Sequence, residues 1–272
     1  RVDLGLIESL GRSGASGVSS GGGAIGASSG GGASGVSSGG GASEGDYASF
    51  NLGDHVGDHP DAVAANRRTL LDDLKPKGVE AIQWLQQVHG TAVFHANEVS
   101  PNAVPPPEAD AVTTDRRGLA LAIMTADCLP VLFCDRLGTQ VAAAHAGWRG
   151  LCQGVLAETI ASFTCSPDTL MAWMGPAISI RHFEVGAEVR DTFLDAFSGP
   201  SAEDIARCFV PQPGVGDKFH ADLYQLARLQ LKSCGVAAIY GGQHCTFADE
   251  SRFYSYRRQP RCGRQASLIA LV

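Results

Sequence analysis

Residues 119–150 read LALAIMTADCLPVLFCDRLGTQVAAAHAGWRG, and this stretch decides the predicted fold. It holds three short apolar runs, 119–125, 130–134 and 140–144, which are consistent with buried strands. The residues that follow, 149–163, carry apolar side chains at helical spacing and predict an amphipathic helix. The stretch therefore predicts three buried strands followed by an amphipathic helix.

The remaining chain after Tyr47 continues this mixture of strands and helices. Asp61 is a candidate cap for a first helix that Pro76 and Gly78 would end. Helices are predicted at 62–74, 185–197 and 221–234, and further strands at 81–88, 91–96, 170–174, 237–240, 253–257 and 266–272. Because the order follows no strict βαβ rhythm, we expect an α/β (α+β) fold: a single domain with a mixed β-sheet core and helices packed outside.

The N-terminal residues have a different composition. Residues 1–46 hold 16 of the 34 glycines, and the sequence ASGVSSGGGA occurs at 15–24 and again at 33–42. Gly/Ser-rich sequence is typical of a flexible linker, because it buries little apolar area on ordering. We therefore predict a low-complexity N-terminal segment at 1–39 and a globular domain at 40–272.

Composition excludes several classes of protein. The 272 residues carry 21 basic and 28 acidic side chains, a formal charge of −7, and no basic stripe that would predict nucleic-acid binding. No apolar run is long enough to cross a membrane, and no signal segment is visible. The eight cysteines form no C-x-x-C pair. These features predict a cytoplasmic protein with reduced thiols that binds neither nucleic acid nor membrane.

Two predicted strand ends carry reactive side chains. The sequence TADCLP places Asp127 and Cys128 between two apolar runs, where a charge is costly unless it is paired. The sequence QQVHG ends in His89 and Gly90. By themselves these residues leave several interpretations open, since a buried thiol is usually a small hydrophobic group and a lone histidine is usually just hydrogen-bonded.

A third reactive segment, AHAGWRG, joins a predicted strand to a predicted helix. His145 ends the strand, Gly147 turns the chain, and Arg149 lies near the helix start. A helix N-terminus offers free N–H groups and a positive dipole, and an arginine can bind a phosphate through two hydrogen bonds. The segment therefore predicts an anion site.

Together these segments resemble the YfiH/laccase-domain family, also called DUF152-type, which was first described as polyphenol oxidases and is now regarded as purine nucleoside phosphorylases. The resemblance covers residues from about 40 to 272. The motifs that carry it are QQVHG (86–90), MTADCLPVLFC (124–134), VAAAHAGWRGL (141–151), SFNLGDHVGDHPDAVAANR (49–67), MGPAISIRHFEVGAEV (174–189), DLYQLARLQL (222–231), FYSYRR (253–258) and GR (263–264).

The resemblance implies a catalytic zinc site made by His89, Cys128 and His145. Two imidazoles and one thiolate suit tetrahedral zinc, and three protein ligands leave a fourth position open. The family's implied activities are phosphorolysis of adenosine, inosine, guanosine and methylthioadenosine, and deamination of adenosine. The expected partners are therefore purine nucleosides and phosphate, bound by a monomer or a homodimer.

Further residues receive roles by their position beside these ligands. Asp127 is predicted to act as a general acid or base, with orientation of a ligand as the alternative. Gly147 and Arg149 are predicted to form the phosphate site. Of the neighbouring pair Arg257 and Arg258, at least one is expected to reach the substrate, and Arg258 is our choice.

One departure from the family pattern concerns substrate binding. Family members usually carry Thr-Arg-x-Gly-Gly about six residues before the position of Tyr47. Gly40 and Gly41 match the end of that motif, but the arginine is missing. The Gly/Ser repeat begins where family sequence is expected, which is also what a frame error would produce.

Two other activities compete with this interpretation. A four-copper laccase is excluded, because the chain has eight histidines and no His-x-His pair to hold the cluster. Copper remains an alternative occupant of the zinc position in vitro. A metal-free hydrolase, with Cys128 as nucleophile and His145 as base, fits the same residues and the family's role in editing peptidoglycan precursors. A non-catalytic module fits them less well.

Overall fold

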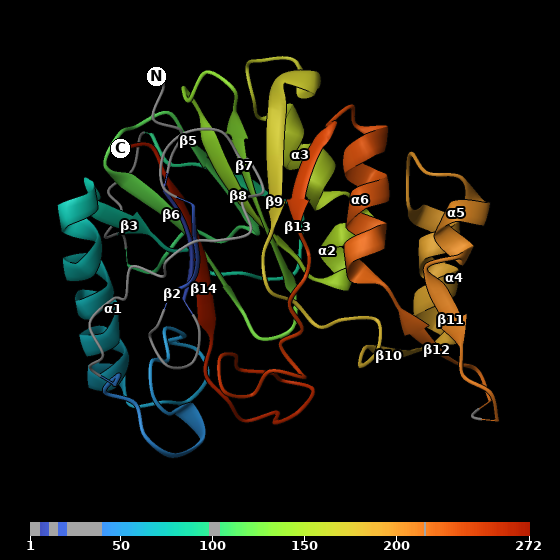
Figure 1. Cartoon of the computed structure of the whole chain (residues 1–272), viewed down its shortest axis with the longest axis horizontal. Coiled ribbons are helices and arrows are strands. Elements are labelled where there is room, and N and C mark those ends of the chain that lie inside the picture. The colour runs from blue at the N-terminus through green and yellow to red at the C-terminus, as the bar shows by residue number, and fades with distance from the viewer. Residues whose placement is uncertain (1–5, 11–15, 21–39, 98–103, 215) are drawn as a thin grey trace.

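Two β-sheets stack at the centre of the fold, with helices on both outer sides (Figure 1). The computed structural model describes residues 6–10, 16–20, 40–97, 104–214 and 216–272. The first sheet has the order β2-β1-β14-β6-β3, formed by β2 (Ser16–Ser20), β1 (Leu6–Leu10), β14 (Gln265–Ala270), β6 (Leu119–Thr125) and β3 (Ala81–Gln83). The second has the order β13-β9-β7-β8-β5-β4, formed by β13 (Ala238–Gly241), β9 (Leu170–Met174), β7 (Leu129–Asp135), β8 (Val141–Ala146), β5 (Ala111–Thr114) and β4 (Val93–His95). This mixed α/β arrangement confirms the predicted fold class.

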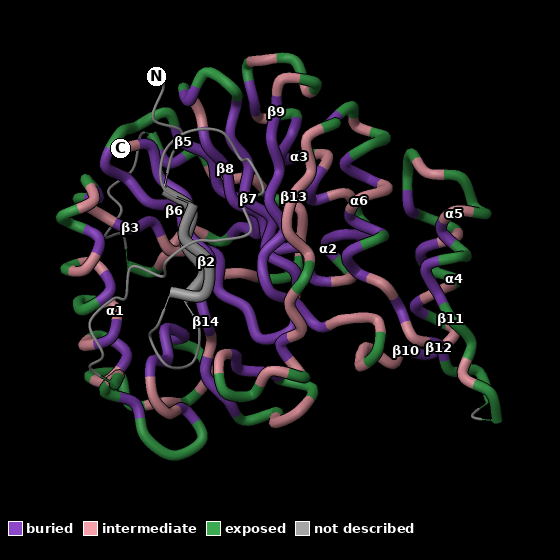
Figure 2. The backbone as a smooth tube through the Cα atoms, viewed as in Figure 1, coloured by how far each residue is buried: buried purple, intermediate pink, exposed green. Residues whose placement is uncertain are grey.

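The apolar runs of the sequence are explained by burial on both faces of each sheet. In β6, Leu119, Leu121 and Ile123 point into a core shared with Leu132 and Trp173 of the second sheet. The intervening alanines of β6 face the opposite side, toward α1 (Pro60–Leu74). Strands β6, β14, β7 and β8 at the centre of the two sheets are accordingly wholly buried (Figure 2).

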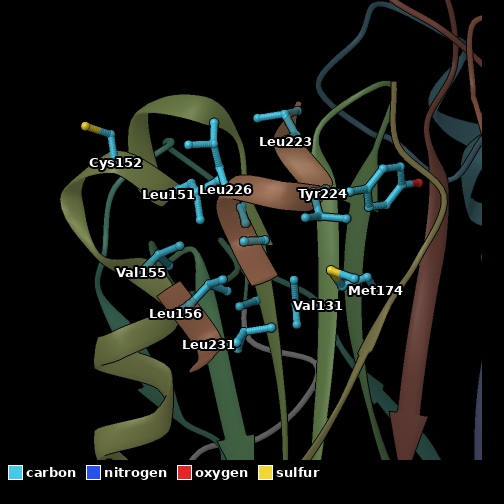
Figure 3. Close-up of a cluster of buried hydrophobic side chains, with 14 of the residues drawn as sticks. Val131, Leu151, Cys152, Val155, Leu156, Met174, Leu223, Tyr224, Leu226 and Leu231 are labelled. Atoms are coloured by element: carbon cyan, nitrogen blue, oxygen red, sulfur yellow. The ribbon is translucent and has the colours of Figure 1, made fainter. Parts of the chain in front are cut away.

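A second core lies between the six-stranded sheet and the helices that cover its outer face. These helices are α2 (Trp148–Gln153), α3 (Val155–Ala161) and α6 (Leu223–Ser233). Figure 3 shows Leu156 and Leu231 meeting Val131 of β7 in this core. The same core extends to a small sheet, β10-β12-β11, and its two helices. Their bounds are β10 (Glu184–Gly186), β12 (Lys218–Ala221), β11 (Phe209–Pro211), α4 (Ala187–Ala196) and α5 (Ala202–Ala206).

Some predicted elements differ in extent from those of the structure. The predicted helix at 149–163 is broken into α2 and α3 by Gly154, which adopts a left-handed φ of 98°. The predicted strand at 81–88 keeps only β3, and the rest is a loop. Residues 253–257 are irregular and end in a turn, with no strand, so that prediction is wrong. The first helix begins at Pro60, which places Asp61 in its first turn and makes His59 the cap.

The low-complexity N-terminal segment contains two strands, β1 and β2, which pair with each other. β1 also extends the first sheet by pairing antiparallel with β14. Within the described part of the chain, no helix has the length and apolar character needed to cross a membrane.

Candidate functional site

Two connections between the stacked sheets carry candidate ligands. Cys128 lies in the three-residue connection that leaves β6 in the first sheet and enters β7 in the second. His89 lies in the loop that leaves β3 in the first sheet and reaches β4 in the second. His89 and Asp127 have φ values of 63° and 97°, which non-glycine residues rarely adopt. The crossovers are therefore sharply turned, and specific contacts hold them.

The Asp127 carboxylate holds the first crossover in place. Its Oδ1 accepts a hydrogen bond from Thr246 Oγ1 at 2.6 Å. Its Oδ2 accepts from Ser255 Oγ at 3.0 Å and from the backbone N–H of Arg257 at 2.7 Å. Both oxygens already accept hydrogen bonds. The geometry therefore favours the alternative role of Asp127, that of a positioning residue that fixes the turn before Cys128.

The Asp110 carboxylate organises both histidines. Its Oδ1 lies 2.8 Å from His145 Nδ1 and accepts from the backbone N–H of His89 at 2.9 Å. Its Oδ2 accepts from the N–H groups of Val88 at 3.1 Å and Gly90 at 2.7 Å. Because Nδ1 of His145 is held by the carboxylate, its Nε2 is left for a ligand. One fully buried side chain therefore fixes a ring and a loop that come from different elements.

The structure brings His89, Cys128 and His145 together. One ligand atom from each lies within 4.8 Å of the others, and Cys128 Sγ is 3.8 Å from His89 Nε2. A Cβ on Gly147 would lie 2.9 Å from His89 Cδ2 and 3.1 Å from Cys128 Sγ, so only glycine leaves room for these side chains. This donor set fits a tetrahedral zinc with one open position.

Cys128, His145 and Asp110 shift one another's pKa values. Burial opposes ionisation of the Cys128 thiol, but the charge and hydrogen bond of His145, with a further contribution from His89, lower its pKa to about 6. Burial likewise disfavours the imidazolium of His145, but Cys128 and Asp110 raise its pKa to about 9. Burial also opposes the charge on Asp110, whose pKa is nevertheless lowered by His145 and by backbone N–H groups. The metal-free site therefore holds a thiolate beside an imidazolium.

A cavity of about 470 Å³ opens onto the three ligands. Its volume falls in the usual range for small-molecule sites, about 300–1,000 Å³. Trp148, Phe183 and Tyr256 provide aromatic lining. The lining also contains three arginines, Arg149, Arg257 and Arg264.

None of these three arginines forms an ion pair with an acidic side chain of the described residues. Arg149 lies over the Trp148 ring at 4.4 Å, and Arg257 donates to the carbonyl of Glu184 at 2.8 Å. The cavity therefore combines aromatic surface with three guanidinium groups that form no ion pair within the described part of the chain.

The residues predicted to bind phosphate or substrate do not all line the cavity. Arg149 lines the cavity, and Gly147 lies against His89 and Cys128. Arg258 does not line the cavity: its guanidinium donates to the carbonyls of Thr246, Phe247 and Phe253. Arg258 therefore holds the 246–258 loop together, and the neighbouring Arg257 lines the cavity in its place.

Sequence reasoning missed Asp110 and Arg264. The available signal for Asp110 was an acid directly before an apolar run, the same signal that identified Asp127. Arg264 stood in the GR motif without an assigned role. The position of the missing family arginine lies within 21–39, outside the described residues.

The stacked sheets, with His89 and Cys128 on their crossovers and His145 near the end of β8, define an α/β protein with a candidate metal centre. A sequence model of the family described as "Multi-copper polyphenol oxidoreductase laccase" matches residues 36–272. The chain belongs to this family, the YfiH/laccase-domain family.

Several curated relatives carry the name of one enzyme. A protein of Pseudomonas aeruginosa named purine nucleoside phosphorylase is 50% identical over 229 residues, 84% of this chain and 88% of that protein. The purine nucleoside phosphorylase YfiH of Escherichia coli is 48% identical over 228 residues, 83% of this chain and 88% of that protein.

Solved structures agree with the fold. The crystal structure of a DUF152 protein from Neisseria meningitidis has a TM-score of 0.77 at 49% identity, covering 86% of this chain and 90% of that one. The structure of a hypothetical protein YfiH from Bacillus licheniformis has a TM-score of 0.77 at 27% identity, covering 85% and 89%.

Proposed function

We propose that this chain is a zinc-dependent purine nucleoside phosphorylase that accepts adenosine, inosine, guanosine and methylthioadenosine, and that it also deaminates adenosine. The observation that carries the proposal is one cavity that combines a three-ligand cluster, aromatic side chains and arginines without carboxylate partners. Relatives about half identical to this chain are named purine nucleoside phosphorylases, which supports the reaction class.

The walls of the cavity suit the two substrates. Trp148, Phe183 and Tyr256 offer ring surfaces against which a purine base can stack. Arg149 would bind phosphate through its planar, two-pronged guanidinium, with Gly147 keeping the neighbouring backbone free of a side chain. Arg257 takes the substrate-facing role that we had assigned to Arg258.

His89, Cys128 and His145 would hold the zinc ion. When bound, zinc supplies Lewis acidity at the open coordination position. Asp110 orients both histidines, and Asp127 fixes the turn that presents the thiolate. The same donors would also accept copper in vitro, because copper(II) binds nitrogen and sulfur ligands more tightly than zinc does.

A metal-free cysteine hydrolase is the second candidate, and one contact favours it. Asp110 lies 2.8 Å from His145 Nδ1, and the far side of that ring faces Cys128. This order of acid, imidazole and nucleophile is the arrangement of a catalytic triad. Zinc analysis of protein purified without added metal separates the candidates, because the hydrolase needs no metal.

Product analysis tests the proposed reaction. Purified protein with bound zinc is incubated with adenosine, with and without phosphate. Phosphorolysis yields adenine and ribose 1-phosphate only when phosphate is present, whereas deamination yields inosine in both conditions. Absence of all these products would contradict the proposal.

Cytoplasmic location and a monomeric or homodimeric state stay predictions.

A further inference from the structure

A second Cys-His pair lies in a separate cavity of about 400 Å³. Cys245 Sγ is 3.4 Å from His182 Nδ1, and both side chains line this cavity. The cavity is bounded by the segment after β9 and by residues 242–248, and it shares no lining residue with the cavity above the His-Cys-His cluster. This pair is not needed for the proposed phosphorylase reaction.

Polar contacts and a stacked ring fix Cys245 Sγ and its neighbouring imidazole in place. The Ser179 hydroxyl donates to Sγ at 3.1 Å, and the Ser179 backbone N–H donates at 3.4 Å. The His182 ring stacks on Phe247 at 4.5 Å with an interplanar angle of 19°, which fixes the imidazole beside the sulfur. Cys245 is only half-buried, so a small molecule entering the cavity can reach it.

The charges along the cavity predict the kind of molecule that would enter. Arg181 and Arg228 both line it, and Arg228 donates to the carbonyl of Gly241 at 2.9 Å, which fixes its position. The lining also contains one carboxylate, Asp222, whose Oδ1 accepts from the Gln225 N–H at the start of α6. A ligand with carboxylate groups therefore meets two guanidinium groups.

We propose that Cys245 is a nucleophilic thiol that exchanges with small disulfides bearing carboxylates. His182 accepts the thiol proton, and the thiolate attacks one sulfur of the disulfide. An S–S bond forms between Cys245 and that sulfur while the original S–S bond breaks. The leaving thiolate takes the proton from His182, so the reaction yields a mixed disulfide and one free thiol. No other oxidant is required.

The experiment measures the rate of this exchange at each cysteine. Intact zinc-loaded protein is incubated with oxidised glutathione near neutral pH, quenched at intervals and mapped by peptide mass spectrometry. Cys165 is the internal reference, because it is also half-buried but has no imidazole partner among the described contacts. We expect Cys245 to react at least about tenfold faster than Cys165, as activated thiols do.

Two variants test the cause of that reactivity. His182→Phe keeps a ring to stack on Phe247 but removes the nitrogen, and should slow the reaction of Cys245 about tenfold or more without changing Cys165. Ser179→Ala removes only the hydroxyl donor and should have a smaller effect in the same direction. Cystamine, a cationic disulfide, should react with Cys245 more slowly than oxidised glutathione does.

Several outcomes would overturn the proposal. Equal rates for Cys245 and Cys165 would show that Cys245 is not activated. An unchanged rate in a folded His182→Phe variant would remove the histidine from the mechanism, and faster reaction with cystamine would contradict the arginine contribution. If His182→Phe does not fold, Ser179→Ala and the comparison of the two disulfides still decide the question.

Discussion

Cys128 with His145 and Cys245 with His182 are two Cys-His pairs in the described part of the chain, and a buried carboxylate distinguishes them. At the first pair, Asp110 holds Nδ1 of His145, which leaves the opposite nitrogen to face Cys128. At the second pair, His182 presents Nδ1 directly to Cys245, and its ring is held by stacking on Phe247. The same two residue types therefore serve different chemistry, because a carboxylate orients one imidazole and an aromatic ring holds the other.

The two pairs also differ in whether the surrounding backbone brings a second histidine to the cysteine. Asp110 also fixes the loop of His89, and this brings a third ligand to Cys128. Cys245 has no second histidine in such a position, and the His-Cys-His group is the one three-residue metal cluster within the described ranges. Three converging donors suit a metal, whereas a single imidazole suits activation of a thiol.

Replacing each cysteine with alanine should give the largest difference in zinc binding and phosphorolysis between the two pairs. Cys128→Ala should abolish zinc binding and phosphorolysis, because it removes a ligand from a three-ligand site. Cys245→Ala, the matched control, should keep both. Zinc content, adenosine phosphorolysis and circular dichroism check this. Zinc retained by a folded Cys128→Ala variant would contradict the metal assignment, and an unfolded one would show that the metal stabilises the fold.

Removing the charge of Asp110 should weaken the first site without removing a ligand. Asp110→Asn keeps the size of the side chain but loses the carboxylate that accepts from His145 and the loop. We expect zinc affinity to fall about 10–100-fold, the usual effect of losing such a contact. The free energy of unfolding should also fall by about 1–3 kcal/mol, because buried groups lose their acceptor.

Asp135→Asn is the matched control for this variant. Asp135 is also a buried carboxylate, and it accepts from Thr139 and from the N–H of Gln140, away from the cluster. The free energy of unfolding of the Asp135→Asn variant should fall by a similar amount, while its zinc affinity should stay unchanged. Chelator competition and denaturant titration measure the two quantities. Equal losses of zinc affinity in the two variants would assign Asp110 a general structural role.

The contrast between the pairs also shows what the sequence could predict. Apolar runs of strand length are locally visible, and 119–125 and 170–174 match β6 and β9 residue for residue. The motifs around His89, Cys128 and His145 identified the three converging side chains by family resemblance. These features are contained in short contiguous segments, so no tertiary information was needed.

The features that escaped prediction depend on contacts between distant segments. Asp110 faces His145 only because β5 pairs with β8 in the register Ala111 to Ala144. Arg257 and Arg258 are neighbours with identical side chains, and the turns of their loop decide which one lines the cavity. No local sequence pattern predicts which of these side chains faces the site, because strand register and loop folding determine it.

The coupled charges of the first pair predict how zinc affinity depends on pH. The pKa of Cys128 is lowered to about 6 and that of His145 is raised to about 9, so the metal-free site holds one proton between these values. Zinc must displace that proton, so its affinity should rise about tenfold per pH unit from about pH 7 to about pH 9, and then level off. Calorimetry in buffers of different ionisation enthalpy counts the proton released. Release of none near neutral pH would contradict the charged pair.

The smallest expected effect concerns the phosphate in the first cavity. Arg149 is exposed, lines the cavity and forms no ion pair with a described residue, so its guanidinium is available to an anion. A hydrogen bond to a charged group contributes about 1.5–3 kcal/mol, and the lower end applies to an exposed group. Arg149→Ala should therefore raise the phosphate KM of phosphorolysis about tenfold. Deamination of adenosine uses no phosphate and should change little.

Two further variants make this prediction specific. Arg149→Lys should give an intermediate phosphate KM, because lysine keeps the charge but loses the two-pronged geometry. Arg207→Ala removes an exposed arginine on α5 that pairs with Glu203, far from either ligand set in the fold, and should leave both reactions unchanged. Steady-state kinetics of both reactions in all three variants provide the comparison. Equal losses of phosphorolysis and deamination in Arg149→Ala would show that this arginine supports the nucleoside or the cavity wall, and phosphate would then have to bind at Arg257 or Arg264.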